Sequence, residues 1–157
     1  MLDVPGHSSG AYYTATEKEY DELTELWEAS VRQTHTFLAP GDIELYRQMI
    51  QEKMFPSCTV VYMKDDDGRI SSFVGVSGDK IEMLFTLPKH FGKGLGKRLF
   101  WHAVCEMGAN KLDVNEQNVE AVNFYMRQGC KVVARSPRDD AGHPYPILHL
   151  ECINSTN

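Results

Sequence analysis

The sequence lacks the features of several classes of protein. No apolar run approaches the roughly 18 residues of a membrane-spanning helix, so we expect no membrane association. Basic residues are not in excess, because 16 Lys and Arg stand against 22 Asp and Glu, and the net charge of −6 argues against nucleic acid as a partner. The first ten residues have neither an apolar stretch nor a cationic start, so we expect no secretory signal.

Cysteine is also sparse, and the four cysteines (Cys58, Cys105, Cys130 and Cys152) form neither a CxxC pair nor a zinc-like spacing with histidine. We therefore expect no metal ion and interpret all four as buried thiols in a reducing compartment. Together with the missing signal, this predicts a cytoplasmic protein. Because no repeat or low-complexity linker divides the chain, we expect a flexible lead at residues 1–10 and a single domain at residues 11–157.

Hydrophobic spacing and turn residues divide the chain into strands and helices. Thr16 and Glu19 form a capping-box pattern in front of a helix, and Asp42 is a candidate cap for the next one. We expect helices at residues 17–34, 42–55, 94–107 and 118–128, and strands at residues 12–16, 59–64, 70–77, 80–87, 111–115, 131–136 and 147–153. This order predicts a mixed α/β sandwich.

A glycine-rich turn joins the strand at residues 80–87 to the helix at residues 94–107. Gly92, Gly94 and Gly96 let successive N–H groups point into one concavity, beside the positive end of the helix dipole. The turn also gathers cations in an otherwise acidic chain: Lys89, Lys93, Lys97 and Arg98. These features predict an anion site suited to a diphosphate. The spacing matches neither the P-loop nor the dinucleotide fingerprint, and the alternative is a tight turn without a ligand.

Two blocks of sequence resemble the GNAT N-acetyltransferase superfamily and, in detail, a subgroup of small bacterial acetyltransferases. LFTLP at residues 84–88, followed by GKGLG at residues 92–96, resembles its acetyl-CoA signature, and LDVNEQN at residues 112–118 resembles its distal segment. The resemblance covers residues 12–153 and implies a mostly antiparallel twisted sheet of about seven strands flanked by about four helices. It also implies transfer of an acetyl group from acetyl-CoA to an amine.

The resemblance assigns the acetyl-CoA site residue by residue. Backbone N–H groups of the strand would hold the thioester arm and the turn would hold the pyrophosphate. The implied cofactor-binding residues are Phe85, Thr86, Leu87, Gly92, Lys93, Gly94, Leu95, Gly96, Lys97 and Asn118. Phe91 departs from the family, which usually has Gln or Arg there. Because Phe91 has no charge, pyrophosphate binding must depend on backbone amides and on Lys93 and Lys97.

Tyr125 is the expected general acid. A phenol can donate a proton to a leaving thiolate, and the resemblance places the family's acidic tyrosine at this position, seven residues after Asn118. The alternative is that Tyr125 belongs to a core stripe with Val122 and Met126, because helical spacing permits both roles.

Carboxylates on two strands are candidates for the general base. Glu82 lies on the largely apolar strand at residues 80–87 and, by alternation, shares a face with Leu84 and Thr86; we expect it to act through a water. The alternative is a strand-edge glutamate in solvent. Asp113 and Asn115 share a face of the next strand, where Asp113 matches a base position of some family members and Asn115 could orient the acceptor.

The acceptor is expected between the loop after the first helix and the loop before the last strand. These loops supply His35 and Phe37 on one side and Tyr145 on the other, and they are aromatic and nearly uncharged. We expect a small-molecule amine or a protein amine as partner, and a monomer or homodimer. A non-catalytic acyl-CoA-binding or sensory module on the same fold is the alternative function.

Overall fold

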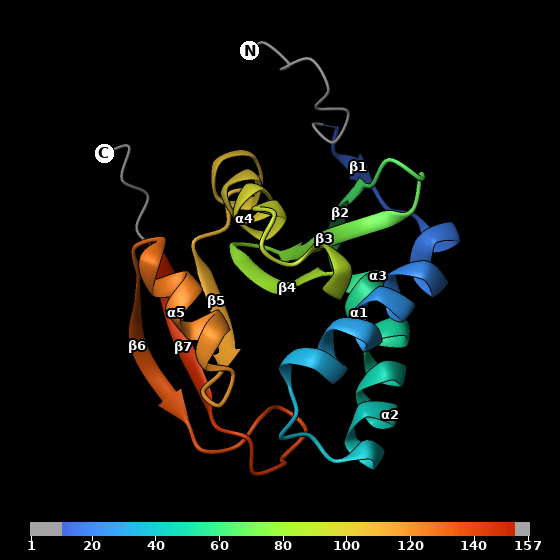
Figure 1. The fold of residues 1–157 in the computed structure, drawn as a ribbon. Helices are drawn as coiled ribbons and strands as arrows, with labels where there is room; N and C mark the ends of the chain where they lie inside the picture. The colour runs from blue at the N-terminus through green and yellow to red at the C-terminus, as the bar shows by residue number, and fades with distance from the viewer. Residues whose placement is uncertain (1–10, 153–157) are drawn as a thin grey trace.

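The computed structural model describes residues 11–152, so the expected lead at residues 1–10 and the end of the last expected strand lie outside the described residues. The sheet carries helices on both faces (Figure 1). Its strands are β1 (Tyr13–Thr14), β2 (Thr59–Lys64), β3 (Ile70–Ser77), β4 (Lys80–Thr86), β5 (Lys111–Asn115), β6 (Cys130–Ser136) and β7 (Ile147–Cys152). The helices are α1 (Tyr20–Thr34), α2 (Pro40–Met49), α3 (Phe55–Ser57), α4 (Leu95–Glu106) and α5 (Val119–Arg127).

The seven strands follow the order β1-β2-β3-β4-β5-β7-β6 across the sheet. Every neighbouring pair is antiparallel except β4 and β5, which are parallel. Short turns connect β2, β3 and β4, whereas a parallel neighbour needs a crossover, which α4 supplies between β4 and β5. The predicted mixed α/β fold with a mostly antiparallel sheet is therefore confirmed.

Alternation along the strands separates two hydrophobic cores. On β2, Val61 and Met63 join the core beneath α4 and α5, whereas Val60 and Tyr62 join the core beneath α1, α2 and α3. Phe100 of α4 is fully buried, and burial of one such side chain stabilises the fold by about 1.5–3 kcal/mol. The helix that follows the glycine-rich turn is therefore firmly fixed to the sheet.

The sheet opens between β4 and β5. These strands pair only at residues 80–81 and 111–112, and Figure 1 shows them separating beyond this point. The separation begins at a β-bulge, because Val76 pairs with Ile81 and Gly75 pairs with Met83, which leaves Glu82 without a partner on β3. One edge of β4 therefore has no neighbouring strand after Ile81.

The second expected helix differs in its start and its course. It begins at Pro40 rather than at the expected cap Asp42, and Ala39 precedes it without a side-chain cap. Proline is favoured at the first helical position because its fixed φ and missing N–H cost nothing there. Asp42 instead accepts a hydrogen bond from Tyr145. The helix then passes through a π-helical segment, Ile50–Met54, into α3.

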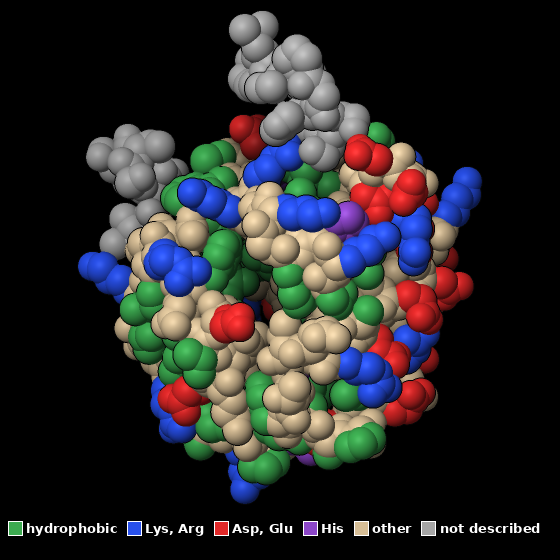
Figure 2. All heavy atoms as spheres, in the orientation of Figure 1, with side chains coloured by type: hydrophobic (Ala, Val, Ile, Leu, Met, Phe, Trp, Pro, Cys, Tyr) green, Lys and Arg blue, Asp and Glu red, His purple; other side chains and the backbone are tan. Residues whose placement is uncertain are grey.

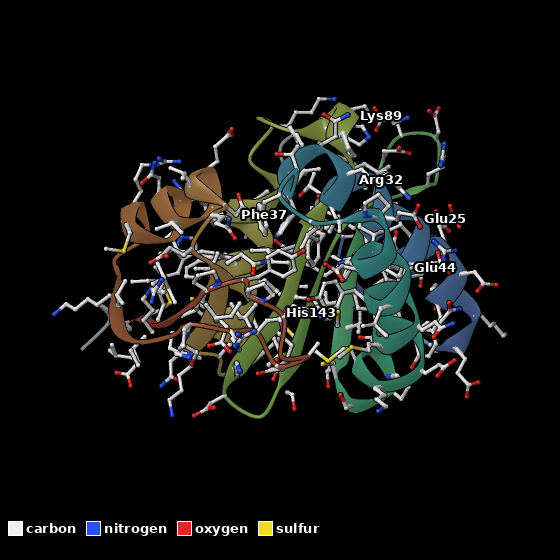
Figure 3. All side chains as sticks on the ribbon, turned by 90° about the horizontal axis from the view of Figure 1, so that it is seen from below. Glu25, Arg32, Phe37, Glu44, Lys89 and His143 are labelled. Carbon is white, nitrogen blue, oxygen red and sulfur yellow. A yellow bond between two sulfur atoms is a disulfide. The ribbon has the colours of Figure 1, made fainter. Side chains whose placement is uncertain are left out.

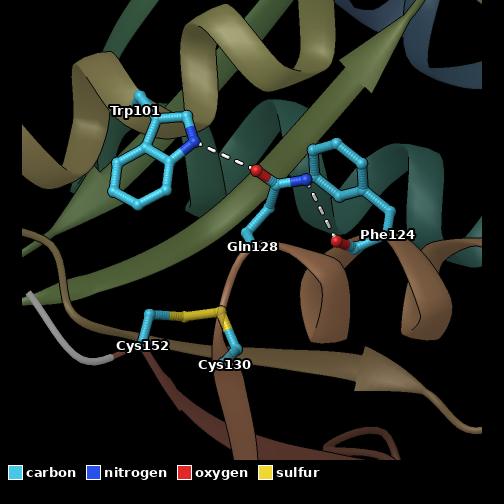
Figure 4. Close-up of a disulfide and its surroundings, with 5 residues drawn as sticks. All are labelled: Trp101, Phe124, Gln128, Cys130 and Cys152. Atoms are coloured by element: carbon cyan, nitrogen blue, oxygen red, sulfur yellow. Dashed lines mark hydrogen bonds between the residues drawn. A yellow bond between two sulfur atoms is a disulfide. The ribbon is translucent and has the colours of Figure 1, made fainter. Parts of the chain in front are cut away.

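Both ends of α5 are anchored. Asn118 caps the first turn, where its Oδ1 accepts a hydrogen bond from the N–H of Ala121 at 3.3 Å. At the other end, Gln128 Oε1 accepts a hydrogen bond from Trp101 Nε1 of α4 at 3.0 Å, and Gln128 Nε2 donates to the carbonyl of Phe124 (Figure 4). These bonds fix the position of α5 relative to α4, and thereby the position of the side chains that α5 carries.

Cys130 and Cys152 form a disulfide between β6 and β7 (Figure 4). They are register partners on adjacent antiparallel strands, with Cα atoms 4.0 Å apart. The interpretation of all four cysteines as buried thiols is therefore wrong for this pair, and also for Cys105, which is exposed. Because disulfides persist chiefly in oxidising surroundings, the reducing compartment inferred from the cysteines loses its support.

Candidate active site

A cleft of about 620 Å³ opens between the glycine-rich turn, the start of α5 and the end of α1. Figure 2 shows a hollow near the middle of this face, with Lys and Arg side chains gathered above it. Most residues predicted to bind the cofactor line the cleft: Phe85, Thr86, Gly92, Gly94, Leu95, Gly96, Lys97 and Asn118. Leu87 and Lys93, which were also predicted, do not line it.

The glycine-rich turn forms a cradle at the start of α4. Gly92 and Gly94 each have a φ of 80°, a left-handed conformation that costs other residues about 1–2 kcal/mol. Gly96 has no positive φ, and a Cβ added there would meet no protein atom within 4 Å. The protein itself therefore does not require glycine at position 96, and the space beside it can hold a ligand against the N–H groups of α4. The arrangement fits a diphosphate.

His90 links the glycine-rich turn to the β2–β3 turn. Lys93 Nζ donates a hydrogen bond to His90 Nδ1 at 3.0 Å, so the ring proton lies on Nε2, which donates to Asp65 at 3.2 Å. His90 itself lines the cleft, as does Phe91, whose side chain is 43% exposed. No sequence signal pointed to His90, because its partner Asp65 lies in the distant β2–β3 turn.

Only part of the predicted backbone site faces the cleft. The N–H of Leu87 donates to the carbonyl of Ser71 on β3 at 2.9 Å, so this amide is not free for a ligand. Because successive N–H groups of a strand point to opposite sides, those of Leu84 and Thr86 point toward the side that β5 has left. Leu84 and Thr86 both line the cleft.

Tyr125 lies in the wall of the same cleft and is 8% exposed. Its ring contacts Phe100 and Phe124, with centroids 5.9 and 5.2 Å away. Burial raises the pKa of Tyr125, so the phenol keeps its proton and can act as a donor at neutral pH. The alternative core stripe is incomplete, because Met126 is 45% exposed. Tyr125 thus packs in the core and also faces the cleft.

A second cleft of about 240 Å³ lies on the other side of β4. Its walls are apolar where α1 and the α2 region contribute, as at Trp27, Val31, Met49 and Ile50. They are acidic at Glu82 of β4, at Asp113 of β5 and at Asp139 and Asp140 of the β6–β7 loop. Asn115 also lines it. His35 and Phe85 line both clefts, so the two spaces meet at these side chains.

The bulge determines which face Glu82 occupies. Glu82 lines the second cleft together with Met83 and Phe85, whereas Leu84 and Thr86 line the first. The prediction that Glu82 shares a face with Leu84 and Thr86 is therefore wrong, because simple alternation fails at a bulge.

The two acidic candidates differ in their environment. Asp113 is engaged at both carboxylate oxygens, by Lys80 Nζ at 2.8 Å and by His149 Nδ1 at 2.6 Å. Within residues 11–152, the one ion-pair contact of Glu82 is a long one, 3.9 Å from Lys80 Nζ. Burial raises the pKa of Glu82, and Asp113 adds to the increase while Lys80 opposes it. Glu82 is therefore the carboxylate that is better placed to accept a proton.

Phe37 and Tyr145 stand behind this second cleft rather than in its wall. Their rings contact each other at a centroid distance of 5.6 Å, and neither lines the cleft. Tyr145 donates to Asp42, and His143 Nε2 lies 3.3 Å from the same carboxylate, so the β6–β7 loop is tied to α2. Figure 3 labels Phe37 and His143, which mark the two segments that meet there.

Together, these features give the protein two adjoining clefts that share side chains and can each hold a ligand. One cleft has an anion cradle and a phenol, the other has carboxylates and apolar walls, and the two meet at His35, after α1, and at Phe85, near the end of β4. Among residues 11–152, no three His, Cys, Asp or Glu side chains are grouped to hold a metal, and no helix combines the length and apolarity needed to cross a membrane.

Comparison with known proteins gives the family. Residues 22–146 match the acetyltransferase (GNAT) domain family, to which the chain therefore belongs. The peptidyl-lysine N-acetyltransferase YjaB of Salmonella typhimurium is 35% identical over 133 residues, which cover 85% of this chain and 91% of the relative. The chain is an acetyl-CoA-dependent N-acetyltransferase.

Solved structures share the fold. The solution structure of apo-form YjaB from Escherichia coli has a TM-score of 0.82 and 32% identity, covering 92% of this chain and 97% of that one. The PaiA N-acetyltransferase of Thermoplasma acidophilum, in complex with coenzyme A, has a TM-score of 0.67 and 18% identity, covering 88% of this chain and 96% of that one.

Proposed function

We propose that the chain acetylates a primary amine by direct attack of the amine on the thioester of acetyl-CoA, with a lysine side chain of a protein or peptide as the preferred acceptor. Relatives named peptidyl-lysine N-acetyltransferases support this class of acceptor. The observation that carries the proposal is the meeting of the two clefts at His35 and Phe85. Two substrates held in adjoining clefts can react without a covalent enzyme intermediate.

Acetyl-CoA would occupy the larger cleft. The N–H groups at the start of α4, with Lys97 beside them, would hold the pyrophosphate, and the N–H groups of Leu84 and Thr86 would hold the pantetheine arm along the open edge of β4. Phe91, which stands where the family usually has Gln or Arg, adds no charge. The cradle therefore depends on backbone donors to a greater extent than in relatives with Arg at that position.

Tyr125 would act as the general acid and Glu82 as the general base. The protonated phenol of Tyr125 faces the cleft in which the sulfur would lie. Glu82, at the bulge in the second cleft, would take a proton from the incoming ammonium group through a water, since only a neutral amine has a lone pair for attack. Asp113, bonded to Lys80 and His149, would fix the positions of these two side chains.

The second cleft suits the side chain of a lysine or a small amine of similar shape. Its apolar side can hold a methylene chain, and its carboxylates attract the ammonium group before reaction. Asn115 would orient the bound amine. We propose that residues 11–157 act as one domain, as a monomer or homodimer. We also propose that the protein works in the cytoplasm because acetyl-CoA is available there, an assignment that no longer rests on the cysteines.

A thiol-release assay tests this function. The wild-type protein, supplied with acetyl-CoA, should release CoA thiol in proportion to a lysine-containing peptide, and mass spectrometry should find the acetyl group on the lysine side chain. A panel of small amines should react more slowly. Tight binding of acetyl-CoA without thiol release from any amine would instead indicate a non-catalytic acyl-CoA-binding or sensory module.

A further inference from the structure

The proposed reaction has to remove two protons from the acceptor nitrogen. An ammonium group loses the first to become a neutral amine, and the nitrogen loses the second when it becomes an amide. Glu82, in the second cleft, is placed for the first proton. The second is released where the new C–N bond forms, which is the place where the two clefts meet.

His35 is the ionisable side chain at that meeting point. It follows the last residue of α1, is 8% exposed, and lines both clefts. Its ring lies 6.5 Å from the ring of Phe85, the other residue shared by the clefts. Burial lowers the pKa of His35 to about 4, so the imidazole is neutral at pH 7.

Hydrogen bonds fix which ring nitrogen of His35 carries the proton. Thr34 Oγ1 lies 2.9 Å from the carbonyl oxygen of Ser30 and 2.7 Å from His35 Nδ1. The hydroxyl has one proton, and a carbonyl oxygen can only accept, so this proton goes to Ser30. Thr34 Oγ1 must then accept from His35 Nδ1–H. The lone pair of the ring is left on Nε2, which has no hydrogen-bond partner among the described residues.

We propose that His35 Nε2 accepts the second proton from the attacking nitrogen, and that Thr34 positions His35 for this role by holding its Nδ1–H tautomer. The inference rests on the proposed function. As the lone pair of the nitrogen forms the C–N bond, the C–S bond breaks and its electron pair goes to sulfur. The nitrogen gives its proton to His35 Nε2, the sulfur takes one from Tyr125, and water returns the proton from His35 to the Tyr125 phenolate. The net result is one proton moved from nitrogen to sulfur.

A weak base is sufficient for this step. The nitrogen becomes strongly acidic as it is acylated, whereas the free ammonium group is far less acidic and has to lose its proton earlier, beside Glu82 in the second cleft. Glu82 and His35 therefore have separate tasks at separate stages, and the buried, neutral state of His35 keeps its lone pair available when the amine arrives.

Exchange of Thr34 tests the positioning role. Thr34→Val keeps the shape of the side chain and removes the acceptor for Nδ1–H, so kcat should fall about tenfold while the affinity for acetyl-CoA is unchanged. Thr34→Ser restores the hydroxyl and should recover most of the rate. Thr24→Val is the matched control, because Thr24 is buried in the same helix and makes the same kind of bond, to the carbonyl of Tyr20 at 2.7 Å. It should lower the melting temperature to a similar degree without lowering kcat.

The tautomer can be measured without any substrate. Long-range ¹⁵N–¹H correlation spectra of the free wild-type protein should show His35 protonated at Nδ1, and Thr34→Val should shift it toward the Nε2–H form. His35→Gln should lower kcat about 10²-fold, because the amide reaches a similar position and cannot take the proton. A wild-type His35 protonated at Nε2, or a full rate in His35→Gln, would overturn the inference. If Tyr125→Phe is slow while His35→Gln is not, the proposed function stands and the role of His35 fails.

Discussion

Replacement of Gly96 by alanine should stabilise the protein and weaken acetyl-CoA binding at the same time. Gly96 is the second residue of α4, has no positive φ, and a Cβ there would meet no protein atom within 4 Å. Alanine should therefore stabilise the helix by about 0.5–1 kcal/mol, as in other helical positions. For a domain of this size, 1 kcal/mol corresponds to an increase in melting temperature of about 2–4 °C.

The same methyl group should occupy space needed by the pyrophosphate. Added volume in a close-packed contact costs about 1–3 kcal/mol, so the Kd for acetyl-CoA should rise about 5-fold to 150-fold. Gly96→Ala should thus raise stability and lower affinity, so the two effects can be told apart. A substitution such as Gly94→Glu cannot separate them. At Gly94, with a φ of 80°, the strain of a left-handed side chain and the negative charge lower stability and affinity together.

Isothermal titration calorimetry and thermal melts measure the two quantities. Gly41→Ala is the matched control, because Gly41 is the second residue of α2, also has no protein atom within 4 Å of an added Cβ, and lines neither cleft. It should raise the melting temperature and leave the Kd unchanged. If Gly96→Ala behaves like Gly41→Ala in both measurements, Gly96 is only part of a turn and the cradle has been misplaced.

Three further substitutions test the remaining roles. Tyr125→Phe keeps the packing and removes the proton, so steady-state kinetics should show kcat about 10² lower with little change in cofactor affinity; a wild-type kcat would return Tyr125 to the core. Glu82→Gln should lower the rate most between the raised pKa of Glu82 and the pKa of the amine, because there the carboxylate is charged while the amine is still protonated. An unchanged pH–rate profile would assign the first proton to solvent. Phe37→Ala should raise the KM of the acceptor, because Phe37 supports the loop and Tyr145 behind the second cleft, and a loss of acetyl-CoA affinity instead would contradict this placement.

Local signals in the sequence were sufficient for the order of elements. The capping box at Thr16 and Glu19 is present, and the helix around Tyr125 falls within the range predicted for it, residues 118–128, in front of the glycine at position 129. The glycine-rich turn was recognisable because its function depends on consecutive residues. Each of these features involves groups within a few residues of one another, so no knowledge of the fold was needed.

Features that depend on contacts between distant segments could not be predicted. The bulge at Glu82 arises from the register of β4 against β3, and it reverses the face expected from alternation. Cys130 and Cys152 are 22 residues apart and become partners only through the register of β6 and β7. His35 was expected in the acceptor site from its loop, but its place at the junction of two clefts depends on how α1 packs beside β4. Sequence patterns carry no direct record of such register and packing.

The separation of β4 from β5 gives the sheet an unpaired edge in its interior instead of at its rim. Exposed edges usually invite other chains to add a strand, but here α1 and α4 pack on opposite faces of β4 and flank the gap. An extended molecule that enters the gap can take the place of the missing strand and join the two halves of the sheet. Substrate binding would then complete the secondary structure of the enzyme, and amide hydrogens along β4 should exchange with solvent more slowly once the gap is filled.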